Sequence, residues 1–208
     1  MSSGSAAKSA GGSIVELVAI VAVALGLALG IQAFLVKPYR IPSESMVPTL
    51  RIGQRVLVNR IGNRFSEPRV GEVIVFHPPT GAESGSCGNK DRKQGQACDR
   101  PLSNRAAINY IKRVVGLPGD KIYIRSGHVY RNGKREQDSY ISRSCARGQD
   151  GRGCNFTTPI TIPPGHFFMM GDNRGDSQDS RFWGPVPRKW IVGGAFATYW
   201  PVRRIGLL

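Results

Sequence analysis

The stretch Ala107–Asp120, AINYIKRVVGLPGD, carries the pattern on which the fold prediction rests. Its first part, residues 107–115, is rich in isoleucine and valine, which favour strands, and the closing LPGD is a typical turn sequence. Successive side chains of a strand point to opposite faces, so Tyr110, Lys112 and Val114 should share one face. The stretch therefore predicts a β-strand that carries a single lysine among apolar neighbours and ends in a turn.

Other short runs of β-branched and aromatic residues flank this stretch. Glycine and proline number 26 and 14 of 208 residues, which favours a turn-rich β protein over a helical bundle. The pair Asn132-Gly133 marks a tight hairpin turn, and the two prolines in 37–42 require an extended segment there. The predicted fold class is mainly β, an antiparallel β-sheet domain, with further strands expected at 55–59, 72–77, 121–125, 128–131, 166–170 and 194–200.

A long apolar segment, Ile14–Val36, precedes these strands and is interrupted only by Glu16 and Gln32. As a helix it would be about 35 Å long, enough to cross a hydrocarbon core. A cleavable signal peptide is the alternative, but its apolar region is usually only ~7–15 residues and follows a basic region. Here Lys8 is the only basic residue before the segment, so a transmembrane helix is the better prediction.

The chain is expected to divide into a tail, an anchor and one large domain. Residues 1–12 are rich in Ser, Gly and Ala, as is typical of a short disordered tail. The transmembrane helix is expected over 13–37. The remaining residues, 38–208, are enough for one β-rich domain with its own core, in which the polar stretches 78–106 and 143–156 are expected to be loops.

The four cysteines lie in these two polar stretches: Cys87, Cys98, Cys145 and Cys154. Four cysteines permit three connectivities, of which the local one closes two short loops. The sequence has no Cys-x-x-Cys and no histidine at a zinc-like spacing, so we expect disulfides and no metal. Disulfides persist outside the reducing cytosol, which indicates an extracytoplasmic domain and a cytoplasmic N-terminus. Lys37 and Arg40 mildly favour the opposite orientation, and we give the cysteines more weight.

The net charge of the chain is +15. Such a charge suits nucleic acid, anionic lipid or a plain solvated surface. The basic residues are spread along the chain, with no aromatic-interleaved nucleic-acid motif. With an anchor present, we expect anionic membrane lipids, or a merely solvated surface, rather than nucleic acid.

Two serines in Pro42-Ser43-Glu44-Ser45-Met46 follow closely after the apolar segment. Serine is a weak nucleophile until a base takes its proton. A lysine serves as that base only when neutral, and burial promotes the neutral form by lowering its pKa by up to ~3–5 units. Lys112 has apolar neighbours, and Ser177 lies in a third cluster. Ser, Lys and Ser can form a catalytic unit without histidine.

Three motifs occur in order: PSESMVPTL at 42–50, YIKRVVGLPGD at 110–120 and GDNRGDSQDSRFWG at 171–184. Together they resemble the bacterial type I signal peptidases, membrane-anchored Ser/Lys proteases that release exported proteins. Any one motif is weak, but three in order are specific. The resemblance implies a serine endopeptidase that removes signal peptides from exported preproteins after small residues of the Ala-x-Ala type, with no cofactor.

Matching motif positions implies a role for each polar residue. Ser45 would be the nucleophile and Lys112 the general base. The hydroxyl of Ser43 and the backbone N–H of Ser45 would form the oxyanion hole. Ser177 would hydrogen-bond to Lys112 and orient it. One acid–base pair would form a structural ion pair near the site: Asp179 and Arg181.

The resemblance also implies two shallow apolar pockets for an extended substrate, reached by β-augmentation. Five residues are candidates for lining them: Ile41, Met46, Leu50, Tyr110 and Ile111. Each could equally be an ordinary core residue, and we expect at least two to be so. The chain departs from the family at Glu44, where glycine is frequent, and we predict that this carboxylate faces solvent. Gln54 stands where aspartate is common, which leaves a local polar contact open.

Two other readings compete. A self-cleaving Ser/Lys repressor-type protease shares this chemistry but needs a DNA-binding module and a cleavable linker, and neither is visible. A catalytically silent, membrane-tethered binding protein would fit the anchor and disulfides but does not require Ser45 together with Lys112. The expected partners are exported preproteins, anionic membrane lipids and the protein-export machinery, at the cell membrane.

Overall fold

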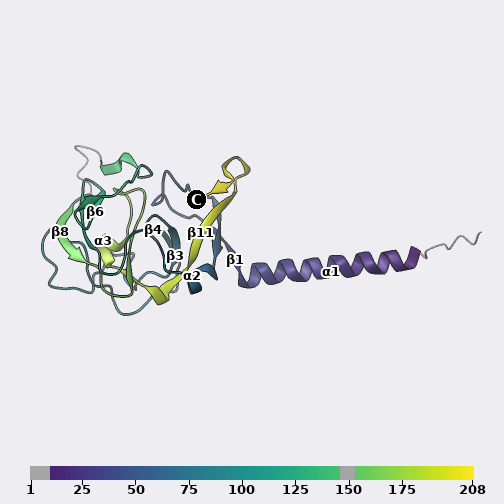
Figure 1. The fold of residues 1–208 in the computed structure, drawn as a ribbon. Coiled ribbons are helices and arrows are strands. Elements are labelled where there is room, and N and C mark those ends of the chain that lie inside the picture. Colours follow the sequence, from purple (N-terminus) through teal and green to yellow (C-terminus); the bar gives the residue numbers. More distant parts are fainter. Residues whose placement is uncertain (1–9, 146–152) are drawn as a thin grey trace, which may run out of the picture.

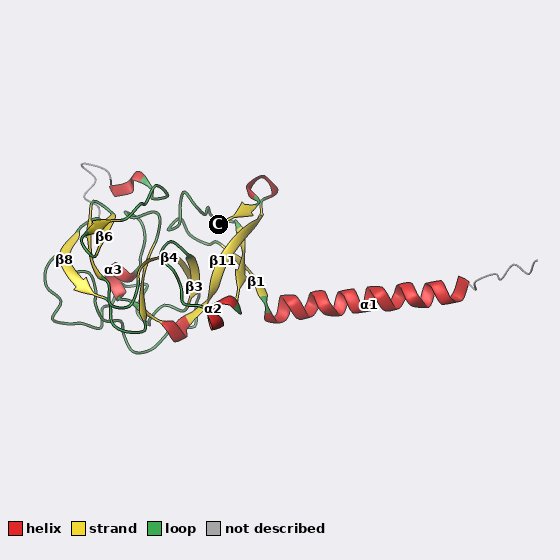
Figure 2. Cartoon of the chain, viewed as in Figure 1, coloured by secondary structure: helices red, strands yellow, loops and turns green. Residues whose placement is uncertain are grey.

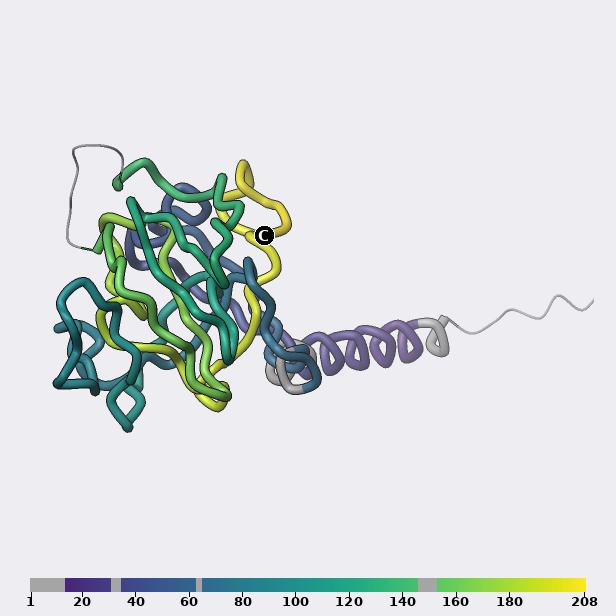
Figure 3. Tube along the Cα trace, turned by 60° about the vertical axis from the view of Figure 1, so that its left-hand side comes forward, coloured from purple at the N-terminus to yellow at the C-terminus, as the bar shows by residue number. Residues whose placement is uncertain are grey.

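The computed structural model describes residues 10–145 and 153–208, without the side chains of residues 10–13, 31–34, 63 and 64. Helix α1 (Ala10–Phe34) extends away from a β-rich body (Figure 1). A view turned by 60° shows the same separation (Figure 3). Over the part of the chain that is described, no helix combines the length and the apolarity needed to cross a membrane. The membrane-crossing helix expected at 13–37 is therefore not confirmed.

The larger sheet is antiparallel and runs in the order β1-β2-β11-β3-β4-β9-β10, with β12 paired to β11. The extended segment expected after the apolar run is its edge strand β1, and the expected strands at 55–59 and 166–170 are confirmed. Its strands are β1 (Val36–Arg40), β2 (Arg55–Asn59), β3 (Val73–Phe76), β4 (Tyr110–Gly116), β9 (His166–Met170), β10 (Val186–Pro187), β11 (Ile191–Trp200) and β12 (Gly206–Leu207).

The smaller sheet has the order β7-β6-β5-β8, and Figure 1 shows it on the side of the body away from α1. Both strands predicted here, β5 (Lys121–Arg125) and β6 (His128–Arg131), are confirmed. Asn132 and Gly133 have φ of 53° and 82°, as a tight hairpin turn requires. This turn leads into the short strand β7 (Lys134–Arg135).

Two strand predictions differ from the structure for physical reasons. The strand expected at 107–115 begins only at Tyr110, because its partner β3 ends at Phe76 and two prolines follow. Strand β8 (Phe156–Thr161) was not predicted, since it contains Pro159. Proline is tolerated there because β8 is the edge strand of the smaller sheet.

Short helices and loops join the strands, and Figure 2 shows how much of the body is loop. The stretch 78–106 is irregular apart from isolated bridges such as Pro79 with Arg105. Of the second expected loop, 143–156, residues 146–152 lie outside the described residues. The short helices are α2 (Gly62–Phe65), α3 (Ser180–Trp183), η1 (Arg143–Cys145), η2 (Arg188–Trp190) and η3 (Val202–Arg204).

Strand β4 lies where three apolar clusters meet. Val114 belongs to one cluster with Phe76 and Trp183, and Val115 belongs to a second one. Ile111 packs against a third. A polar side chain on this strand is therefore surrounded by apolar groups, which is the setting that the sequence predicted for Lys112.

Candidate active site

The segment between β1 and β2 carries the two candidate serines. Its ends are joined by hydrogen bonds from the Ile41 N–H to the Gln54 carbonyl at 2.8 Å and from the Gly53 N–H to the Ile41 carbonyl at 2.9 Å. Met46 and Leu50 are fully buried and fix the segment to the core. These anchors hold Ser45, which is 8% exposed, at the surface of the core.

Glu44 is exposed, as predicted, so its carboxylate lies in water beside the buried Ser45. The side chain of Gln54 also has a defined role, because its Oε1 accepts a hydrogen bond from the Arg51 N–H at 2.5 Å. The polar contact left open by this departure from the family pattern is therefore made within the same turn.

Lys112 lies on β4 and points at Ser45. Its Nζ donates to the Ser45 Oγ at 2.5 Å, although the two residues are 67 positions apart. The side chain is 4% exposed, and its Nζ lies 5.6 Å from the centre of the Tyr110 ring. The strand pairing with β3 and β9 thus creates the contact that the order of the motifs had predicted.

Burial lowers the pKa of Lys112 from 10.5 to about 8. The negative charge of Asp179 acts in the opposite direction, and the positive charge of Arg181 lowers the pKa further. Loss of hydration disfavours the ammonium form more than the nearby carboxylate favours it. Lys112 is therefore suited to take a proton near neutral pH, as a general base must.

Ser43 is exposed, and its Oγ lies 3.3 Å from the Ser45 Oγ. A hydroxyl at this position is within reach of a group bonded to Ser45. The structure therefore brings Ser43, Ser45 and Lys112 together at one point.

The segment after β9 packs directly against the serine segment. The Asn173 N–H donates to the Ser45 carbonyl at 3.1 Å. Gly171 leaves no space for a side chain, since a Cβ there would collide with the Ser45 carbonyl and the Ser177 hydroxyl. Ser177 is therefore close to the site, 7% exposed.

The hydrogen bond expected between Ser177 and Lys112 is not found. The Ser177 Oγ is buried and has no hydrogen-bond partner in the described parts of the chain. The Nζ of Lys112 instead donates to the Ser45 Oγ. A buried hydroxyl without a partner is unusual and requires an explanation.

The Asp179–Arg181 ion pair is present, with 2.7 Å between Arg181 Nη2 and Asp179 Oδ2, and both side chains are fully buried. Arg181 also donates to the carbonyl of Ser177 at 3.2 Å, and the Gly171 N–H donates to Asp179 at 3.0 Å. Burial alone would raise the pKa of Asp179, but Arg181 and these hydrogen bonds hold it below its usual value. Through these bonds the pair holds the segment that carries Ser177, at Gly171 and at Ser177 itself.

A second buried ion pair was not predicted. Arg113 donates to Asp172 from Nε at 2.9 Å and from Nη2 at 2.7 Å. The Tyr140 ring covers the guanidinium at 4.1 Å, and Thr49 donates to Asp172 at 2.5 Å. Arg113 and Asp172 lie in the second and third motifs, and Thr49 lies in the first, so this network joins all three. The sequence signal that could have revealed this network was that each of its three residues lies in a different one of the three motifs.

The candidate cleft has a volume of about 460 Å³ and is lined by residues from Tyr39 to the pair Ser45 and Lys112. Three of the five candidate pocket residues line it: Ile41, Tyr110 and Ile111. Met46 and Leu50 are not among the residues that line it. Both are fully buried in the cluster that anchors the serine segment, as the alternative reading allowed.

Both local disulfides are present, Cys87–Cys98 and Cys145–Cys154. The second one adjoins the site, because Ser144, next to Cys145, accepts a hydrogen bond from the Gly175 N–H at 2.8 Å. The first is tied to α3 by a bond from the Cys98 N–H to the Arg181 carbonyl at 2.9 Å. The disulfide loops therefore brace the segment that carries Ser177.

Within the described residues, no group of three or more His, Cys, Asp or Glu side chains could hold a metal ion.

Comparisons with known proteins show the family to which the chain belongs. Residues 14–200 match the family "Signal peptidase, peptidase S26". Signal peptidase I of Leptolyngbya laminosa is 37% identical over 94% of this chain and 84% of its own length. Signal peptidase I of Pseudomonas aeruginosa is 34% identical over 85% of this chain and 70% of its own length. A crystal structure of signal peptidase I from Enterococcus faecalis aligns with a TM-score of 0.41 at 24% identity, over 62% of this chain and 97% of that one.

Proposed function

Because the chain belongs to the signal peptidase family, peptidase S26, whose members are serine endopeptidases, we propose that it cleaves signal peptides from exported preproteins by Ser/Lys acyl-enzyme catalysis. The observation that carries this proposal is the buried contact of 2.5 Å between Lys112 Nζ and Ser45 Oγ. The lowered pKa of Lys112, about 8, supports it.

The chemical steps follow from these positions. Neutral Lys112 accepts the hydroxyl proton as Ser45 Oγ attacks the carbonyl carbon of the scissile bond. The Ser43 hydroxyl and the Ser45 N–H stabilise the oxyanion that forms. Lys112 then passes its proton to the leaving amine. The ester formed on Ser45 is hydrolysed by a water molecule, with Lys112 again as the base.

We assign Ser177 the task of holding Lys112 in its protonated state. A lysine that has accepted the serine proton needs an acceptor for its additional N–H. The buried, unpaired Ser177 Oγ is close to the site and has lone pairs available. The absence of a hydrogen-bond partner for it among the described residues supports this role.

The substrate is expected to bind extended along the backbone of residues 39–43 and of 109–112, which both line the cleft. Ile41, Tyr110 and Ile111 would contact its side chains. A cleft narrowed by these residues favours small residues such as alanine before the scissile bond.

We place the enzyme at the cell membrane, attached through α1, with its N-terminus cytoplasmic and the β-rich domain outside. The exposed apolar side chains of α1, such as Leu17 and Leu29, support attachment to lipid. The two disulfides support an oxidising compartment. The preproteins, anionic lipids and export machinery are the partners that this location implies.

Protease added to intact spheroplasts tests this topology. The added protease should degrade the domain while a cytoplasmic marker stays intact. Full protection of the domain until the cells are lysed would contradict the proposed orientation.

Cleavage of a purified preprotein whose signal peptide ends in Ala-x-Ala tests the activity itself. Ser45→Ala should lower kcat/KM at least about 10³-fold, since the nucleophile is lost. Ser103→Ala, which removes an exposed hydroxyl from the loop at 78–106, is the matched control and should change the rate less than about twofold. Wild-type activity in the Ser45 variant would contradict the mechanism.

A further inference from the structure

A second hollow of about 540 Å³ lies next to the catalytic cleft and shares Tyr39 and Asn109 with it. Its lining is strongly basic, and no Asp or Glu is among the described residues that form it. Six of these residues carry or can carry a positive charge: Lys37, Arg60, His77, Arg105, Arg188 and Lys189. We refer to this hollow as the basic pocket.

The charge of the basic pocket is only partly balanced. Arg188 pairs with Glu67, with 3.4 Å between Nε and Oε2, but the Glu67 side chain is 74% exposed. The described lining holds five Lys and Arg residues and no Asp or Glu, so the basic pocket carries an excess of positive charge. Such an excess in a concave site attracts an anion.

The position of the basic pocket distinguishes between kinds of anion. Lys37 lies on β1, three residues after the end of α1. The Arg60 N–H donates to the Leu35 carbonyl at 3.0 Å, which fixes Arg60 at the base of the same helix. If α1 is held in a membrane, the basic pocket lies at the level of the lipid phosphates.

The basic pocket also has an apolar wall, made by Trp190, Ile191 and Val192. Trp190 is 5% exposed, so it is part of the core as well as of the wall. A free phosphate ion makes no use of apolar surface, whereas the glycerol and first acyl carbons of a lipid do. A lining that combines cations with apolar groups fits a phospholipid headgroup.

We propose that the basic pocket binds the phosphodiester headgroup of an anionic phospholipid, next to the end of the catalytic cleft that faces α1. The proposal rests on the membrane attachment given under Proposed function. A lipid held there would fix the cleft close to the membrane surface, from which a signal peptide emerges. Tyr39 and Asn109 line both the basic pocket and the catalytic cleft, so the bound lipid would lie beside the substrate site.

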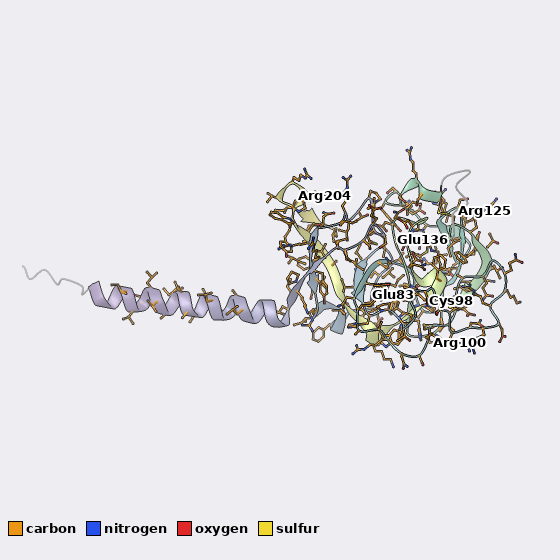
Figure 4. The ribbon with its side chains drawn as sticks, turned by 180° about the vertical axis from the view of Figure 1, so that it is seen from behind. Glu83, Cys98, Arg100, Arg125, Glu136 and Arg204 are labelled. Atoms are coloured by element: carbon orange, nitrogen blue, oxygen red, sulfur yellow. A yellow bond between two sulfur atoms is a disulfide. The ribbon has the colours of Figure 1, made fainter. Side chains whose placement is uncertain are left out.

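Titration of the full-length protein in phosphocholine micelles with dihexanoyl-phosphatidylglycerol tests the proposal. Trp190 lines the pocket, so tryptophan fluorescence reports binding. The pocket variant Arg105→Gln with Lys189→Gln removes two exposed cations. The matched control, Arg125→Gln with Lys134→Gln, removes two exposed cations from the smaller sheet; Figure 4 shows Arg125 at the end of the body away from α1.

We expect the pocket variant to bind about 25-fold more weakly, at about fivefold for each charge removed. The control should bind within about twofold of wild type. The charge-preserving variant Arg105→Lys with Lys189→Arg should keep most of the affinity. Dihexanoyl-phosphatidylcholine should not compete.

Three results would overturn the proposal. Equal weakening in the control would mean that the whole basic surface, rather than the pocket, attracts lipid. Inorganic phosphate binding as tightly as the lipid would indicate a free-anion site, and an aspartate-rich peptide displacing the lipid would indicate a peptide site. A separate assay distinguishes failure of this proposal from failure of the proposed function. It measures preprotein cleavage by the wild-type protein in the same micelles without phosphatidylglycerol. An inactive wild type would contradict the proposed function but would leave the proposal of lipid binding in the basic pocket unaffected.

Discussion

The catalytic cleft and the basic pocket are neighbours that share Tyr39 and Asn109, yet their lysines differ in chemistry. Lys112 is 4% exposed and has a pKa lowered by burial to about 8. Lys37 and Lys189 are exposed. The difference teaches that exposure, rather than residue type, decides whether a lysine serves as a base or as a fixed positive charge.

The size of this effect follows from the titration curve. A lysine with an unperturbed pKa is neutral in only about one molecule in a few thousand at pH 7. With the pKa at about 8, roughly one molecule in ten is neutral at that pH. Burial thus makes Lys112 a usable base.

The strongest way to break the comparison is to remove the buried lysine. Lys112→Ala should lower kcat/KM for preprotein cleavage at least about 10³-fold, because the base of Ser45 is lost. Lys134→Ala, which removes an exposed lysine from β7, should change it less than about twofold. Both variants need the same far-UV circular dichroism spectrum as wild type. Comparable losses in the two would refute the distinction between buried and exposed lysines.

A pH profile sharpens the comparison with a smaller effect. The active form of Lys112 is neutral, so activity should rise with pH and level off above the lowered pKa of about 8. Well below that value kcat/KM should fall about tenfold per pH unit, and the total fall from pH 8 to pH 6 should be about 50-fold. Initial rates on a preprotein between pH 5.5 and 9.5 measure this. A midpoint near 10.5 would show that Lys112 is not buried during catalysis.

Much of the fold was predictable, and the failures have local causes. Strands β5 and β6 were correct because β-branched residues and an Asn-Gly turn act within a few residues of each other. Strand β8 was missed because Pro159 forbids a central strand, and only the sheet order shows that it lies at an edge. The start of β4 depended on where its partner β3 ends.

In the candidate site, too, some residues were predictable from the sequence and others were revealed only by the structure. The three motifs identified Ser45 and Lys112, and the structure places them in contact. Sequence could not separate Ile41 from Met46, since both are apolar and five residues apart, but only Ile41 lines the cleft. The network around Asp172 was missed because its partner Arg113 is 59 residues away.

The sequence by itself determined the local strands, the loop cysteines and the order of the three motifs, because these depend on neighbouring residues. Only the tertiary structure decided which of the apolar residues form the cleft and where the cations gather. These outcomes depend on burial and on contacts between distant segments. Lys112 shows the reason most directly, since its pKa is set by the loss of water around it, which no neighbour in the sequence can impose alone.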